Sequence, residues 1–158
     1  MDIHANFHIE LFLMHDELEI VWGSKIPTPI EKGYPILYDD MVYWVLFADN
    51  EAIAYTSSLM MDDRRFVLVG NTYVRKEWRS KGLHSHLLKE RNKSAHMEGV
   101  TKVTVLNPIE ESQMDNLVKV VSKLGYRQIK SYDDAKDIMT NEEYIKLYCE
   151  QQQIWRLD

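Results

Sequence analysis

Residues 74–88 read VRKEWRSKGLHSHLL, and this stretch decides the fold. It follows Phe66–Val74, whose β-branched and apolar residues predict a strand, and it leads into leucines at helical spacing. A helix leaves its first N–H groups without intrahelical partners, and its dipole favours an anion at that end. The order strand, basic glycine turn and helix therefore predicts a phosphate site in the loop Arg79–His84, called here the glycine loop, where Gly82 permits close backbone approach.

Positive charge is concentrated around this loop. The chain carries a formal net charge of −6, but residues 75–93 hold seven Lys or Arg against two Glu, a local +5 that leaves −11 for the rest. This surplus favours an anion site, although a solvated helix face gives the same pattern. The net acidity argues against duplex nucleic acid as the main partner. A single-stranded nucleic-acid surface is a weaker alternative, because Trp78 is the one aromatic residue interleaved with these cations.

Length and composition predict one soluble domain, residues 1–158. Hydrophobic residues make up 45% and charged residues 28% of the chain, and no apolar run approaches the ~20 residues that span a bilayer. The N-terminus lacks the basic and apolar regions of a secretory signal, and Cys149 is the only cysteine. We therefore expect a cytoplasmic protein without disulfides. His4, His8 and His15 lack metal-ligand spacing, and no metal is expected.

The rest of the chain predicts an α/β (α+β) fold with a mixed, mostly antiparallel central sheet flanked by helices. The expected strands are Phe7–Leu13, Val42–Phe47, Ala52–Thr56, Phe66–Val74, Lys102–Leu106, Tyr126–Tyr132 and Ile154–Leu157. The expected helices are Met14–Trp22, one from Leu83 that ends near Gly99, one from a capping box at Ser112–Asp115 to Gly125, and one from Asn141 to about Glu150. The segment 23–35 holds Pro27, Pro29, Gly33 and Pro35, so it predicts an irregular connection that borders a substrate cleft.

Two motifs resemble the GNAT acetyltransferase family, of which the chain would be a divergent member. The family's pyrophosphate loop reads Arg/Gln-x-x-Gly-x-Gly/Ala after a strand that ends in Val, and here Val74 stands five residues before Arg79-Ser80-Lys81-Gly82-Leu83-His84. The second landmark is a helix that ends Lys-Leu-Gly-Phe/Tyr, matched by Lys123-Leu124-Gly125-Tyr126. The resemblance covers about Val42 to Tyr132.

This resemblance implies an acyl-CoA, most simply acetyl-CoA, as the acyl donor. The pantetheine arm would lie between the strands Phe66–Val74 and Lys102–Leu106, and amides of Ser80 to Ser85 would hold the pyrophosphate. The implied coenzyme-binding residues are Thr72, Tyr73, Val74, Arg79, Ser80, Lys81, Gly82, Leu83, His84 and Ser85. Side chains of Arg75, Lys76 and Lys81 would add long-range attraction. Asn107 ends the next strand near the expected thioester and is, with Thr72, a candidate for a catalytic role.

Three positions depart from the family pattern. His84 replaces the second small residue of the loop, Val121 stands where a Tyr often protonates the leaving thiolate, and the set Leu68, Gly70 and Thr72 offers no ionisable base.

Two hypotheses about function follow. The first is an N-acyltransferase that transfers acetyl to a primary amine of a small molecule or a protein, by direct transfer in a ternary complex, since Cys149 is distant in sequence. The second is a module that binds acyl-CoA or a protein partner without turnover.

The acceptor is not named by the sequence. The acidic residues Asp16, Glu17, Glu19, Asp39 and Asp40 would attract a cationic amine, although an acidic solvated surface is the simpler explanation for them. A homodimer is left open.

Overall fold

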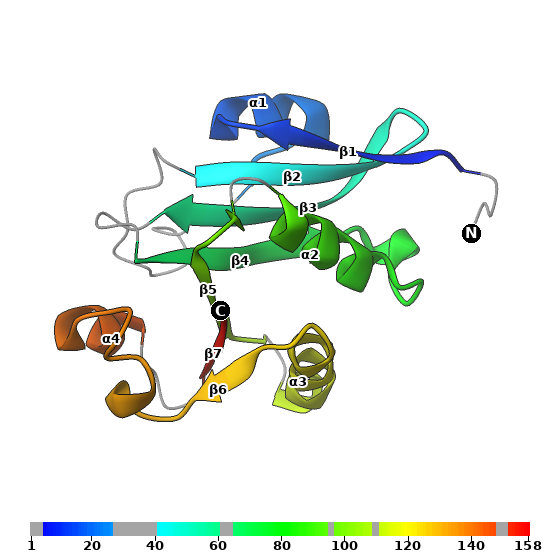
Figure 1. The fold of residues 1–158 in the computed structure, drawn as a ribbon. Coiled ribbons are helices and arrows are strands. Elements are labelled where there is room, and N and C mark those ends of the chain that lie inside the picture. The colour runs from blue at the N-terminus through cyan, green and yellow to red at the C-terminus, as the bar shows by residue number, and fades with distance from the viewer. Residues whose placement is uncertain (1–4, 27–40, 61–64, 95–96, 109–110, 148–151) are drawn as a thin grey trace. The chain divides into compact units, whose positions relative to one another are not determined.

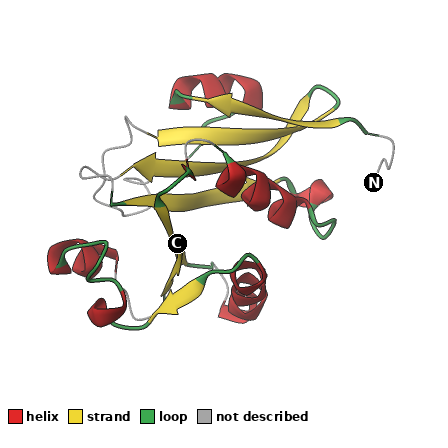
Figure 2. Ribbon diagram, viewed as in Figure 1, coloured by secondary structure: helices red, strands yellow, loops and turns green. Residues whose placement is uncertain are grey.

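The computed structural model describes residues 5–26, 41–60, 65–94, 97–108, 111–147 and 152–158. Figures 1 and 2 show their order along the chain. The strands are β1 (Phe7–Phe12), β2 (Met41–Ala48), β3 (Glu51–Met60), β4 (Phe66–Val74), β5 (Thr101–Leu106), β6 (Arg127–Ile129) and β7 (Gln153–Leu157). The α-helices are α1 (His15–Trp22), α2 (Leu83–Lys93), α3 (Met114–Lys123) and α4 (Asn141–Leu147). No helix in the described part of the chain is long and apolar enough to cross a membrane.

Hydrogen bonds join the strands into a mixed sheet in the order β1-β2-β3-β4-β5-β7-β6. The pairs β1–β2, β2–β3, β5–β7 and β6–β7 are antiparallel, and β4–β5 is parallel. This confirms the expected α/β fold with a mostly antiparallel sheet flanked by helices. The sheet is shared by two compact units, unit 1 (residues 1–59 and 70–96) and unit 2 (residues 60–69 and 97–158).

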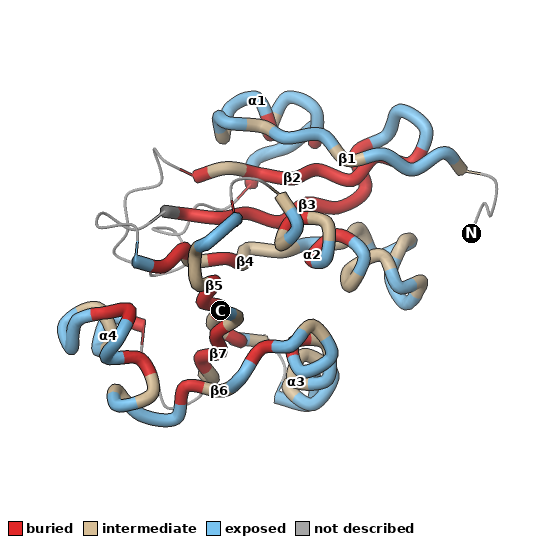
Figure 3. Tube along the Cα trace, viewed as in Figure 1, coloured by how far each residue is buried: buried red, intermediate tan, exposed pale blue. Residues whose placement is uncertain are grey.

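In unit 1 the strands β2 and β3 are buried along most of their length (Figure 3). Helix α1 ends at Trp22, whose ring contacts Tyr55 of β3, whereas Arg91 of α2 donates a hydrogen bond to Thr56. Successive strand residues point to opposite faces, so α1 and α2 cover opposite faces of this part of the sheet. Burial on both faces explains why Val42–Phe47 is a continuous hydrophobic run rather than an alternating one.

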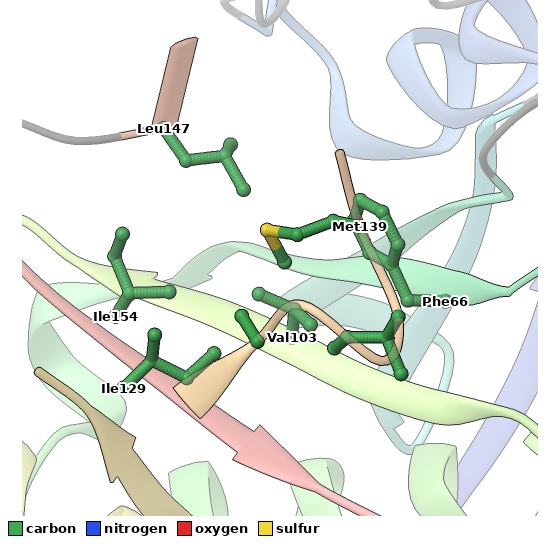
Figure 4. Close-up of a cluster of buried hydrophobic side chains, with 8 residues drawn as sticks. Phe66, Val103, Ile129, Met139, Leu147 and Ile154 are labelled. Carbon is green, nitrogen blue, oxygen red and sulfur yellow. The ribbon is translucent and has the colours of Figure 1, made fainter. Parts of the chain in front are cut away.

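Unit 2 has its own hydrophobic core (Figure 4). Phe66 of β4 and Val103 of β5 are fully buried there, together with Met139 from the segment before α4. A second cluster lies under α3, where Val121 packs with Tyr126. These clusters join elements that are distant in sequence.

Two predicted element ends are wrong. Helix α2 ends at Lys93 rather than near Gly99, because Ser94 turns extended (ψ 147°) and donates its N–H to the Arg91 carbonyl. The predicted strand Tyr126–Tyr132 shortens to β6, since the Asp134 carboxylate accepts the Lys130 N–H at 2.9 Å and bends the chain out of the sheet.

The predicted capping box is also absent. A 3-10 helix, Glu111–Gln113, contains Ser112 and leads directly into α3, and no side chain caps the N-terminus of α3. The predicted irregular segment with Pro27, Pro29, Gly33 and Pro35 lies outside the described residues, apart from its start. So do His4, Asp39, Asp40, Cys149 and Glu150.

Candidate functional site

The glycine loop joins the end of β4 to the start of α2. A 3-10 helix, Lys76–Trp78, follows Val74, and the backbone then adopts left-handed conformations at Ser80 (φ +63°) and Gly82 (φ +76°). The His86 N–H donates to the Gly82 carbonyl at 3.1 Å. The N–H groups of residues 83–85 come before this bond, so the helix itself supplies no acceptor for them.

The space in front of Gly82 is open. A Cβ atom added at Gly82 would meet no atom within 4 Å, and the first turn of α2 contains no acidic residue. The left-handed backbone accounts for glycine at this position. The free N–H groups and the positive end of the helix dipole both fit an anion placed in this space.

Two arginines, Arg75 before the glycine loop and Arg79 at its first position, are held by backbone carbonyls. Arg75 donates from Nε to the Ala52 carbonyl at 2.8 Å and from a terminal nitrogen to the Trp22 carbonyl at 2.7 Å, and its guanidinium lies 3.9 Å from the Trp22 ring centroid. Arg79 donates to the Val74 carbonyl at 2.9 Å and lies 5.3 Å from the Tyr73 ring centroid. Arg75 is thus a structural link within unit 1, and Arg79 is an exposed cation at the first position of the loop.

Strand β4 is irregular just before the predicted coenzyme residues. Gly70 (φ +154°) and Asn71 (φ +51°) both have positive φ, and the Ser57 hydroxyl donates to the Gly70 carbonyl at 2.8 Å. Thr72 follows with its hydroxyl 2.8 Å from the hydroxyl of Thr56. A side-chain hydroxyl thus satisfies the displaced Gly70 carbonyl.

Thr72 and Tyr73 point to opposite faces of the strand. Thr72 lies on the α2 face with Thr56, whereas Tyr73 stacks near Tyr55 (ring centroids 6.1 Å apart) on the α1 face. Burial, and then the neighbouring Tyr73, raise the pKa of Tyr55 to about 12, so its phenol stays protonated at neutral pH. Tyr73 is 43% exposed and offers a ring to solvent beside Arg79.

His84 is half-buried in the first turn of α2. Burial, and then the positive charge of Arg91, lower its pKa below the ordinary value of 6.5. The imidazole is therefore neutral at neutral pH in the free protein, and it brings no positive charge to the glycine loop.

The low pKa of His84 predicts a pH-dependent loss of stability. Between the folded pKa and 6.5 the unfolded chain binds more protons than the folded one, so stability falls as pH falls through this range. We expect a His84→Gln variant to gain melting temperature relative to wild type between about pH 7 and about pH 5. Circular dichroism at a series of pH values measures this, with the exposed His86→Gln as matched control. If the difference in melting temperature between His84→Gln and wild type did not change with pH, a neutral His84 would be contradicted.

Two further positions singled out in the sequence, Asn107 and Val121, belong to unit 2. Asn107 is exposed directly after β5 in unit 2. Val121 is buried (4% exposed) among the side chains of Leu106, Tyr126 and Trp155. This position therefore presents an apolar group to a hydrophobic cluster.

The predicted acidic acceptor surface is only partly described. Asp16 and Glu17 are exposed on α1, but Glu19 is half-buried and accepts the Ile26 N–H at 2.7 Å. The His15 ring is 3.0 Å from the Ile26 carbonyl and 2.7 Å from the Tyr43 hydroxyl. Glu19 and His15 together bind the backbone of Ile26, so Glu19 has a structural role.

Sequence reasoning missed the polar group under α2, where Arg91 is 2% exposed and donates to Thr56. The signal was present, because Arg91 follows Leu87 and Leu88 by four and three residues and therefore shares their buried helix face. By charge alone, Arg91 is only one of the cations in residues 75–93.

Comparison with family models gives one relevant match. The model described as the acetyltransferase (GNAT) family matches residues 11–126. A comparison with curated protein sequences finds no match.

Solved structures share the fold at low sequence identity. An acyl-CoA N-acyltransferase from Pseudomonas aeruginosa has a TM-score of 0.62 and 13% identity, covering 97% of this chain and 100% of its own. A Bacillus subtilis acetyltransferase solved in complex with CoA has a TM-score of 0.62 and 18% identity, and the match covers 97% of this chain and 99% of the acetyltransferase. An acetyltransferase from Thermus thermophilus has a TM-score of 0.59 and 14% identity, covering 94% and 96%. These likenesses establish a shared fold.

Proposed function

The chain belongs to the GNAT acetyltransferase family, and on this premise we propose that it is an acyl-CoA-dependent N-acyltransferase. The proposed donor is acetyl-CoA and the proposed acceptor is a primary amine, with direct transfer in a ternary complex. The observation that carries the proposal is the glycine loop, where left-handed Gly82 leaves open space in front of the N–H groups of α2. A helix N-terminus of this kind binds phosphate through its N–H groups and its dipole.

We propose that the coenzyme contacts two segments of unit 1. Its pyrophosphate would accept hydrogen bonds from amides in residues 80–85, and Arg79 would contribute charge. Its pantetheine arm would bond to backbone groups of Thr72, Tyr73 and Val74, next to the irregular Gly70–Asn71 stretch. Both segments belong to the same compact unit.

The chemistry requires little from ionisable side chains. A neutral amine attacks the thioester carbonyl, so placement, a donor for the developing oxyanion and removal of one proton suffice. Water can relay that proton. This fits a chain in which Leu68, Gly70 and Thr72 include no base. We also propose that both units belong to one domain, because the matched range 11–126 spans both.

The second candidate function is coenzyme binding without turnover. It is favoured by Val121, which is buried in an apolar cluster at the position where the resembled family often carries a tyrosine. The two candidates share the coenzyme site and differ only in whether acyl transfer follows.

Thermal unfolding in the presence of acyl-CoAs tests the coenzyme site that both candidate functions share. At a concentration of about 100 times Kd, acetyl-CoA should stabilise the fold by about 2.7 kcal/mol, which is on the order of 5–10 °C in Tm for a chain of this size. Thiol release from acetyl-CoA with a panel of primary amines then separates enzyme from binder. A Tm that no acyl-CoA changes would refute both candidates, and binding without thiol release from any amine favours the second.

A further inference from the structure

A buried cation lies on the inner face of α2. Arg91 is 2% exposed and is the largest of the fully buried side chains. One terminal nitrogen donates to the Thr56 hydroxyl at 2.8 Å, and Nε donates to the Asn92 side-chain oxygen at 3.1 Å. Burying a guanidinium costs free energy unless its N–H groups are paired, so the hydrogen bonds to Thr56 and Asn92 offset part of that cost.

The guanidinium sets the direction of a hydrogen-bond chain through Thr56. Arginine only donates, so Thr56 accepts from Arg91 and has one proton to give. That proton has two acceptors, the Thr72 hydroxyl at 2.8 Å and the Gly70 carbonyl at 3.4 Å. The Ser57 hydroxyl already donates to the Gly70 carbonyl at 2.8 Å. Thr56 can therefore turn its proton to Thr72 and give up only the longer bond.

The consequence appears at Thr72. When its oxygen accepts from Thr56, its own O–H is released to donate elsewhere, and the positive charge at the start of the chain polarises that O–H. Thr72 is half-buried and follows the irregular residues Gly70 and Asn71. It belongs to the strand segment that we assign to the pantetheine arm.

We propose that Arg91 and Thr56 orient the Thr72 hydroxyl as a hydrogen-bond donor to the thioester carbonyl oxygen. This inference rests on the proposed function. Thr72 would be the catalytic residue, and Arg91 and Thr56 would be positioning residues.

The step balances without proton transfer from Thr72. The amine nitrogen bonds to the carbonyl carbon, and the C=O π electrons move to the oxygen, where the Thr72 O–H stabilises the charge. The C=O bond then reforms, the C–S bond breaks and the thiolate leaves with the electron pair. The proton lost by the amine passes through water to the thiolate.

Infrared difference spectra of bound acetyl-CoA, isotope-labelled at the carbonyl, test the hydrogen bond without any acceptor amine. In the wild-type chain the thioester C=O stretch should lie at lower frequency than in Thr72→Val, and Thr72→Ser should restore it. Thr56→Val and Arg91→Met should give intermediate positions, and Thr56→Val decides alone if Arg91→Met does not fold. Lys89→Met, an exposed cation on the same helix, is the matched control and should leave the band in place.

The outcomes separate the inference from the proposed function. If wild type does not bind acetyl-CoA, both are overturned. If it binds and the band has the same position in wild type and Thr72→Val, the hydroxyl chain is overturned and the proposed function stands.

With an accepted amine, Thr72→Val should lower kcat by about 10²-fold, because one oxyanion donor is lost. KM for acetyl-CoA should change little. Arg91→Met should lower kcat in the wild-type background and add no further loss in the Thr72→Val background, since both act through one hydroxyl. If Arg91→Met lowered kcat by the same factor in both backgrounds, Arg91 would have only a structural role and its positioning role would be overturned.

Discussion

Acetyl-CoA should fail to raise the melting temperature of a Gly82→Asp variant at concentrations that saturate the wild-type chain. A side chain at Gly82 would extend into space that is open within 4 Å, at the positive end of α2. A carboxylate there would face the coenzyme pyrophosphate, and juxtaposed like charges cost several kcal/mol, which weakens Kd on the order of 10²–10³-fold. The loss should be largest at low salt, because counterions screen exposed charges.

Gly82→Asn is the matched control for this variant. Asn and Asp have nearly the same shape, and both tolerate the left-handed conformation that Gly82 adopts (φ +76°) better than other residues. Any backbone strain is therefore common to both variants, and the charge alone differs. Calorimetry should give a Kd for Gly82→Asn much closer to wild type than that for Gly82→Asp. Equal losses in both variants would mean that steric fit, not an anion at this site, explains the effect.

The sequence predicted the elements around the glycine loop well, because each is specified locally. Strand β4 has the predicted bounds Phe66–Val74, and α2 starts at Leu83 directly after Gly82. Hydrophobic pattern and a left-handed glycine suffice for such assignments. The end of β6 is different, because it depends on the Asp134 carboxylate accepting the Lys130 N–H. A hydrophobic pattern contains no information about that bond.

The local backbone of the candidate site could be predicted from the sequence, whereas contacts between side chains of different elements could not. The turn at Gly82 between β4 and α2 could be predicted from residues 74–88, and its role as a phosphate site stays a prediction. The hydroxyl chain joins Arg91 of α2, Thr56 of β3 and Thr72 of β4, so it becomes visible only when the strand register and the helix face are known. The lowered pKa of His84 likewise depends on burial and on the positive charge of Arg91, which lies on the same helix. Charge counting shows Arg91 only as one of the cations in residues 75–93.

Replacing Arg156 should destabilise unit 2 more than replacing any exposed arginine. Arg156 on β7 is 3% exposed, and its five N–H groups donate to the carboxylates of Asp137 and Asp158 and to the Asp134 carbonyl. We expect Arg156→Met to lower the free energy of unfolding by about 2–3 kcal/mol. This lies below the cost of breaking a fully buried pair, because the Asp137 and Asp158 side chains are 62% and 49% exposed and can be rehydrated.

The Arg156 effect should depend on pH. The Arg156 hydrogen bond lowers the pKa of Asp137 below its ordinary 3.8. Burial raises the pKa of Asp158, but hydrogen bonds from Arg156, Thr101 and Arg127 outweigh it, so the net shift is also downward. A lowered carboxyl pKa stabilises the fold above the unfolded value of 3.8, and this contribution disappears as pH falls through the folded pKa.

Urea unfolding of wild type, Arg156→Met and Arg127→Met at a series of pH values measures both expectations. Arg127 is the cross-strand partner of Arg156 and bonds the same Asp158, but its side chain is 58% exposed. Its replacement should cost no more than about 1 kcal/mol, as for other exposed ion pairs. The difference in unfolding free energy between wild type and Arg156→Met should be largest at neutral pH and should decrease below pH 3.8. Two outcomes would contradict these expectations: equal losses of unfolding free energy in Arg156→Met and Arg127→Met, or a difference between wild type and Arg156→Met that does not change with pH. Either would mean that β7 is held to the Asp134–Asp137 segment by packing of the Arg156 stem and not by its hydrogen-bonded charge.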